Sequence, residues 1–158
     1  MIADMNPEDI VGDFKEATLT FFDGHARKVL YSEIETPYPD GKLIVSTTTP
    51  DGVISHVNKA FTEMSGYSES ELIGAPHYIL RHPDMPPAAF KDLWETVSRG
   101  EKWQGIVKNL RKDGGYYWVK ATVIPNVRGG QVVGYTSVRR KPSRSKVDAC
   151  IELYPTLF

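Results

Sequence analysis

Short segments in which apolar and polar residues alternate recur along the chain, and this spacing predicts β-strands. Two of them, KLIVSTTT and VISHVN, are joined by a Pro-Asp-Gly turn and indicate a hairpin. Two more, WQGIVKNL and YYWVKATVIP, are separated by RKDGG, which is a strong hairpin signal. The segment QVVGYTSVRR follows another turn. The pattern therefore predicts five strands, at residues 42–49, 53–58, 103–110, 116–125 and 131–140.

Between the second and third predicted strands the apolar residues follow a helical period instead. Residues 58–67 and 68–74 predict two short helices, and Ser68 with Glu71 matches a capping box in the second. Residues 86–100 predict a longer helix that begins at prolines and ends at glycine. The order β-β-α-α-α-β-β-β predicts an α+β fold, a five-stranded antiparallel sheet with helices on one face.

The N-terminal segment also shows helical spacing. Asn6 can cap a helix that begins at Pro7, and the apolar residues Ile10, Phe14 and Phe21 would share one face of it. Residues 25–34 then predict a second short helix. We therefore expect an N-terminal helical extension.

A proline-rich stretch at residues 36–41 predicts a linker after this extension. The expected organisation is an N-terminal helical cap at 1–36, a main domain at 37–141 and a C-terminal linker toward an output element at 142–158.

Composition narrows the class of protein. The chain has 158 residues, a formal net charge of −1 and one cysteine, Cys150. This charge gives no attraction to nucleic acid, and a single thiol favours a reducing compartment. No apolar run reaches the roughly 18 residues of a spanning helix, so no membrane insertion is expected. With no signal-peptide pattern at the N-terminus, the prediction is a cytoplasmic protein.

One predicted loop carries several polar side chains close together. Residues 76–90, PHYILRHPDMPPAAF, place two histidines, an arginine and an aspartate among four prolines. One interpretation is a surface turn held by its own Arg–Asp pair; the other is a rigid site for a negatively charged group. A metal site is disfavoured because no further ligands have suitable spacing. The basic run that begins at Arg139 and Arg140 is interpreted as a solvated strand end.

The predicted sheet offers a matching surface. Trp103, Gly105, Val107 and Asn109 share one face of their strand. An amide such as Asn109 costs roughly 1–3 kcal/mol if it is buried without a partner, and Gly105 leaves room for a flat object.

These motifs resemble those of PAS sensor domains, and specifically the flavin-binding PAS domain of bacterial aerotaxis receptors. The resemblance rests on HVNKAF, SGY with ELIG, PH, RHPDMP, AAFKDLW, WQGIVKN and RKDGGYYWV. It covers about residues 37–141, and residues 1–36 are longer than the short cap expected in that family.

The resemblance implies FAD, bound noncovalently between the helices and the inner sheet face. Arg81, helped by His77 or His82, would hold the pyrophosphate, and Asp84 would fix the arginine or accept from a ribose hydroxyl. The implied cofactor-binding residues are Asn58, His77, Arg81, His82, Asp84, Phe90, Trp103 and Asn109.

At the ring, Trp103 would offer a flat apolar surface, and Asn109 and Asn58 would add polar contacts. Helix capping is an equal alternative for Asn58. Trp94 is interpreted as core, and Phe90 is left open between core and cofactor.

The implied function is redox, oxygen or energy-state sensing, with flavin redox changes passed through the last strand to an output domain or partner. Haem in a gas sensor and a cofactor-free dimerisation or interaction module are the alternatives. No catalytic motif supports an enzyme. Cys150 lies outside the matched region, which disfavours photoadduct chemistry. We expect a homodimer through the N-terminal helix or the sheet.

Overall fold

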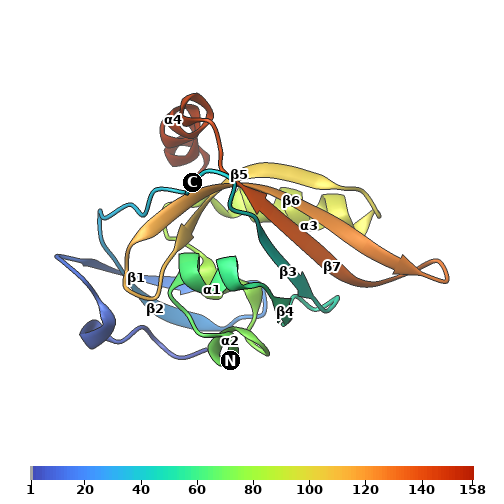
Figure 1. Ribbon diagram of the computed structural model, residues 1–158, viewed down its shortest axis with the longest axis horizontal. Helices are drawn as coiled ribbons and strands as arrows, with labels where there is room; N and C mark the ends of the chain where they lie inside the picture. Colours follow the sequence, from blue (N-terminus) through green and yellow to red (C-terminus); the bar gives the residue numbers. More distant parts are fainter. Residues whose placement is uncertain (1) are drawn as a thin grey trace.

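The computed structural model describes residues 2–158 and contains two sheets. The larger sheet has five antiparallel strands in the order β4-β3-β7-β6-β5, with β7 at its centre. A separate two-stranded hairpin of β1 and β2 precedes it in the chain (Figure 1). The strands are β1 Lys15–Thr20, β2 Ala26–Tyr31, β3 Ile44–Thr48, β4 Ile54–Val57, β5 Trp103–Leu110, β6 Tyr116–Arg128 and β7 Gln131–Arg140.

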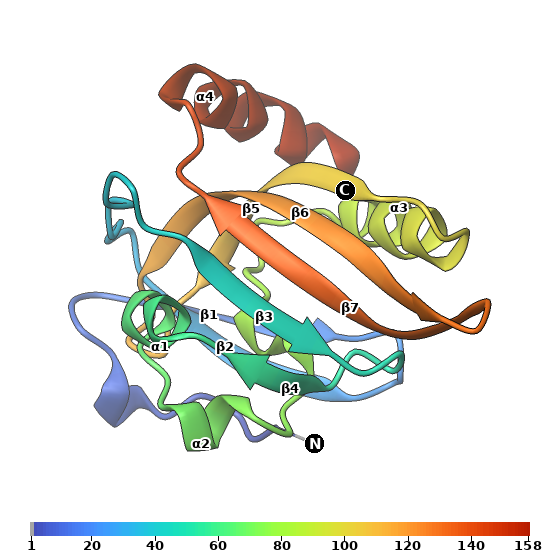
Figure 2. The same cartoon turned by 45° about the vertical axis from the view of Figure 1, so that its right-hand side comes forward.

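Helices connect β4 to β5 and cover the inner face of the larger sheet, as Figure 2 shows for α1 and α3. A last helix, α4, lies on the opposite side of β5 and β6 (Figure 1). The helices are η1 Pro7–Asp9, α1 Lys59–Ser65, α2 Glu69–Leu72, η2 His77–Leu80, α3 Pro87–Ser98, α4 Arg144–Leu153 and η3 Tyr154–Leu157, where η denotes a 3₁₀ helix. The predicted fold class, an antiparallel sheet with helices on one face, is confirmed.

Local sequence explains where the helices begin and end. Ser68 and Glu71 form the predicted capping box at α2. Helix α3 starts at Pro87, where the missing N–H removes no helical hydrogen bond. It is followed by Gly100 at a φ of +80°, a conformation that glycine adopts without strain.

The alternation within the strands separates the two faces of the sheet. The register aligns Gly105 with Ala121 and Ala121 with Arg139, so these three positions cross the inner face side by side. Trp103 and Asn109 are buried on the same face, as predicted. The inner face therefore carries both apolar and polar side chains under the helices.

The prediction of N-terminal helices is wrong. After the single turn η1, residues 15–31 form the β1–β2 hairpin, in which Gly24 takes a φ of +86° at the turn. The hairpin packs on its own domain: Phe21 stacks on Tyr78 with ring centroids 3.8 Å apart. Arg27 donates to the carbonyl of Ile79 at 3.0 Å. The N-terminal helix through which we predicted dimerisation is therefore not formed, and a dimer through the sheet stays a prediction.

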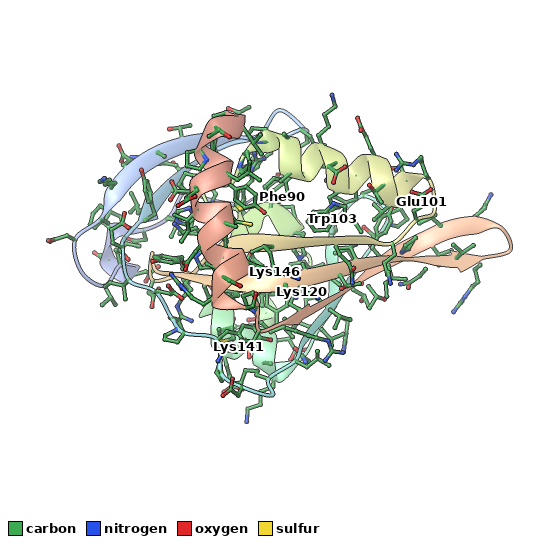
Figure 3. All side chains as sticks on the ribbon, turned by 90° about the horizontal axis from the view of Figure 1, so that it is seen from above. Phe90, Glu101, Trp103, Lys120, Lys141 and Lys146 are labelled. Carbon is green, nitrogen blue, oxygen red and sulfur yellow. The ribbon has the colours of Figure 1, made fainter. Side chains whose placement is uncertain are left out.

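The C-terminal segment is more ordered than the linker we expected. Helix α4 lies across β5 and β6, and Figure 3 shows its Lys146 beside Lys120 of β6 in the view from above. Val147 of α4 is buried, and the Tyr154 hydroxyl donates to the carbonyl of Ile106 in β5. Among residues 2–158, no helix is both long enough and apolar enough to cross a membrane.

Candidate cofactor site

The loop from Pro76 to Pro86 spans the inner face from one sheet edge to the other. At its start, Pro76 forms an isolated β-bridge with Val53, next to β4. At its end, Arg81 forms an antiparallel bridge with Asn109 on β5. Because β4 and β5 are the two edge strands, the loop lies over the whole width of the sheet. Any guest on the inner face would lie under it.

His82 is held in one protonation state. Its Nδ1 accepts a hydrogen bond from the Asp84 backbone N–H at 3.0 Å, which places the ring proton on Nε2. The side chain is buried, and burial together with the charge of Lys108 lowers its pKa to about 3. Nε2 is buried and has no partner among the described residues. His82 is therefore a neutral donor with a free N–H.

Arg81 is half-buried rather than pointing freely into solvent. Its guanidinium carbon lies 4.6 Å from the centroid of the Phe90 ring on α3, a cation–π contact. Burial lowers the pKa of Arg81, and its Nε is buried without a partner in the described chain. Phe90 thus supports the arginine, which keeps an N–H available.

The expectation that Asp84 fixes Arg81 is wrong. The Asp84 carboxylate is exposed and pairs with Lys108 Nζ at 2.8 Å. Lys108 alternates with Asn109 along β5, so it points to the outer face. Asp84 therefore reaches around the sheet edge, and the alternative of a self-satisfied Arg–Asp pair is not observed either. A ribose contact by Asp84 stays a prediction.

The flat object that Gly105 accommodates is the indole of Trp103. A Cβ at Gly105 would lie 2.3 Å from Cη2 of that ring, so only glycine fits beneath it. The indole N–H donates to Asp92 of α3 at 2.8 Å, which fixes its orientation. Trp103 therefore occupies the inner face where we expected the ring of a guest, and a guest beside it must displace or stack against the indole.

The two asparagines differ in their roles. The Asn58 carbonyl accepts from the backbone N–H groups of Phe61 and Val45, and its amide donates to Leu43, which is the capping alternative. Asn109 is buried at the loop bridge on the inner face. Contact of either residue with a cofactor stays a prediction, although Asn109 is the better placed.

Trp94 packs partly buried against the core, in edge contact with Tyr135 at 5.6 Å, as expected of a core residue.

Sequence reasoning missed Arg139. Instead of a solvated strand end, its side chain is 2% exposed on the inner face of β7. It donates to Ser46 Oγ at 2.6 Å and to His77 Nε2 at 2.9 Å, and it lies 4.7 Å from the centroid of the Phe61 ring. The alternation Tyr135, Ser137, Arg139 was the signal that could have placed it inward.

His77, predicted from the loop, is brought to Arg139 rather than to His82. Burial and the positive charge of Arg139 lower the pKa of His77 to about 3. The neutral ring then accepts from the guanidinium through Nε2 and carries its proton on Nδ1. His77 positions Arg139 without neutralising it.

Four buried polar atoms share one property: within residues 2–158 they lack a hydrogen-bond partner. An unpartnered buried polar group costs about 1–3 kcal/mol, and more when it is charged, so each of these atoms needs an explanation. All can donate a hydrogen bond, which fits a guest rich in acceptors, such as a flavin with its carbonyls and phosphates. They are Arg81 Nε, His82 Nε2, the Tyr117 hydroxyl and a terminal guanidinium nitrogen of Arg139.

Other sites fit less well. Two surface hollows of about 290 and 280 Å³ lie outside the inner face, one lined by residues such as Trp118 and Val147 and the other beside Met5 and Arg27. Among the described residues, no three His, Cys, Asp or Glu side chains gather as a metal site. The thiol of Cys150 lies on α4, across the sheet from the inner face.

Comparison with known proteins finds relatives that match more than half of this chain. The aerotaxis receptor of Escherichia coli (strain K12) is 47% identical over 122 residues, which are 77% of this chain and 24% of the receptor. The biofilm dispersion protein BdlA of Pseudomonas aeruginosa is 35% identical over 94 residues, 56% of this chain and 22% of that protein. The chain thus spans about a quarter of the length of these relatives.

A solved structure agrees in fold. It is described as "Flavin Analogue Sheds Light on Light-Oxygen-Voltage Domain Mechanism", is 28% identical and has a TM-score of 0.61. The superposition covers 72% of this chain and 86% of that chain. A family model described as PAS fold matches residues 54–139, more than half of the sequence. The chain therefore belongs to the PAS family.

Proposed function

We propose that this PAS domain binds FAD noncovalently between its helices and the inner sheet face, and that it senses the redox state of its surroundings. The observation that carries the proposal is the buried guanidinium of Arg139, which has no carboxylate partner in the described chain. A protein retains such a charge at a cost of stability unless a guest compensates it. The similarity to the aerotaxis receptor and to a structure described with a flavin analogue makes a flavin the guest of choice.

A bound flavin supplies a redox couple whose reduction changes the charge of the ring. In this chain, the loop from Pro76 to Pro86 covers the guest and excludes water. Arg81, half-buried near the loop's end, suits the pyrophosphate, and Trp103 offers an aromatic surface for the ring. Asn109 would supply a polar contact at the ring edge.

The effect of flavin reduction would be transmitted to the C-terminal segment through the sheet. Strand β7 carries Arg139 on its inner face, and β5 carries the Tyr154 contact of the C-terminal segment on its outer side. A redox state that alters contacts on the inner face can therefore shift the docking of α4 and η3. We propose that an output domain or partner protein reads this shift, in a cytoplasmic signalling protein related to aerotaxis receptors.

Purification followed by absorption spectroscopy tests the cofactor. Flavin absorbs at about 450 nm, and haem gives a Soret band at about 400 nm. Heat extraction and chromatography against FAD and FMN standards then identify the chromophore. A protein purified without chromophore is titrated with FAD, FMN and haem. Binding of haem alone would replace the proposal with a gas sensor, and binding of none would leave an interaction module.

A further inference from the structure

Arg139 lies on the inner face of the central strand β7, one residue before the end of that strand, and its side chain contacts neutral groups. Its side-chain partners are Ser46 and His77, with the Phe61 ring against the guanidinium. The Tyr38 hydroxyl donates to its backbone carbonyl at 2.9 Å. One terminal nitrogen is left with no partner in the part of the chain that the structure describes.

No acidic group of the described residues 2–158 compensates the charge of Arg139. The ion pairs of residues 2–158 involve other cations, such as Lys108 with Asp84 and Arg144 with Glu35. Burial lowers the pKa of Arg139 to about 10, so the guanidinium remains charged at neutral pH. Tyr117 and Tyr38, whose pKa values are raised by burial, stay neutral there. Within residues 2–158, Arg139 thus brings an uncompensated positive charge to the inner face.

Arg139 is buried more deeply than Arg81, the cationic residue of the loop. Arg139 is 2% exposed on the central strand, whereas Arg81 is half-buried beside edge strand β5, and the nearby Asp84–Lys108 pair borders solvent. Phosphates keep water or cations around them, while an aromatic ring loses little by full burial. A flavin that enters this site therefore has its phosphates toward Arg81 and its ring toward Arg139.

We propose that Arg139 is the cationic partner of the flavin ring and favours its reduced state. This inference rests on the proposed function. A ring that takes up two electrons and one proton from a chemical reductant carries one net negative charge, and the buried guanidinium stabilises that charge. The same arginine then determines specificity for a guest with acceptor atoms on its ring, and His77 is a positioning residue that orients it.

The test is the midpoint potential of the bound flavin, measured by dye-coupled reduction in wild type, Arg139→Gln and Arg139→Lys. We expect Arg139→Gln to weaken the preference for the reduced ring at least tenfold, which lowers a two-electron potential by about 30 mV. Arg139→Lys keeps the charge and should retain most of the wild-type potential. Arg140→Gln is the matched control, because Arg140 is the next residue of β7 and is exposed.

Binding affinities distinguish a contact of Arg139 with the flavin ring from a contact with the phosphates. Apoproteins are titrated with riboflavin, FMN and FAD, and a ring contact predicts the same fold-loss in Arg139→Gln for all three. A loss confined to FMN and FAD would assign Arg139 to a phosphate and overturn the inference. Unchanged potential and affinity in Arg139→Gln would also overturn it, while the proposed function would fail only if wild type binds no flavin.

The apoprotein gives an independent reading if a variant loses flavin entirely. If Arg139 serves flavin binding and not the stability of the fold, Arg139→Met should leave the apoprotein at least as stable as wild type in urea. Clear destabilisation or unfolding of apo Arg139→Met would show that Arg139 is a structural tie between β7, β3 and η2, and would refute a role reserved for the guest.

Discussion

Two histidines, the buried His82 and the partly buried His77, are kept neutral by the fold, and this couples stability to pH. The pKa of His82 is lowered from 6.5 to about 3, so the unfolded chain takes up a proton below pH 6.5 that the folded protein does not. The free energy of unfolding is therefore full above pH 6.5 and falls as the pH drops toward 3. For His82 alone the loss between pH 7 and pH 5 is about 2 kcal/mol.

Urea denaturation at pH 7 and pH 5 measures this loss. His82→Asn keeps an acceptor for the Asp84 N–H but removes the titration, so its stability should fall less between the two pH values than that of wild type. His56→Asn, at an exposed position, should keep the wild-type difference. The residual slope in His82→Asn belongs to His77, whose pKa is lowered in the same direction. An unchanged slope in His82→Asn would contradict a neutral buried His82.

Individual positions on the inner face were predictable where a strand shows a simple alternation. The row from Trp103 to Asn109 was placed correctly because side chains in a strand point to opposite faces in turn. Arg139 was misplaced because a charged residue beside two other basic residues is usually solvated. Its partners Phe61 and Ser46 come from distant parts of the chain, so the alternation along β7 was the local signal of its burial.

At the scale of elements, the N-terminal hairpin shows how tertiary contacts override local spacing. Phe14 and Phe21 have a spacing compatible with a helix, yet they lie directly before and directly after β1. Asp23-Gly24, which lies between β1 and β2, is a hairpin turn signal that the helical spacing outweighed. The outcome is decided by contacts with the domain, where Ser32 N–H donates to Gly114 at 2.8 Å and Phe21 stacks on Tyr78.

This packing predicts unequal roles for two adjacent phenylalanines. Phe21 is 4% exposed and stacked on the loop helix η2, whereas Phe22 is 76% exposed. Phe21→Ala should lower the free energy of unfolding by about 3–5 kcal/mol, and Phe22→Ala by no more than about 0.5 kcal/mol. Chemical denaturation followed by circular dichroism measures both. Equal effects of the two substitutions would mean that the hairpin does not clamp η2.

Across the whole molecule, one sheet separates two layers. The helices from α1 to α3 and the loop cover the inner face, while α4 and η3 rest on the outer face (Figure 3). Strand β5 contacts both layers: the indole of Trp103 covers Gly105 on the inner face, and the backbone carbonyl of Ile106 accepts a hydrogen bond from Tyr154 of the outer layer. A displacement of β5 by a guest would therefore reach the C-terminal segment without a separate pathway.

The docking of α4 has one buried anchor, which gives the last prediction. Val147 is 2% exposed against the sheet, and burial of a valine contributes about 1.5–3 kcal/mol. Val147→Asp removes this contribution and opposes burial of a charge, so undocking should become at least about tenfold more frequent. Trypsin cleavage after Arg144, followed over time by mass spectrometry, measures it because neither residue of that bond is changed, with Ile151→Asp as the control because Ile151 is 47% exposed. Cleavage of Val147→Asp at the wild-type rate would show that α4 is held by other contacts, and the sheet would then lack a releasable output helix.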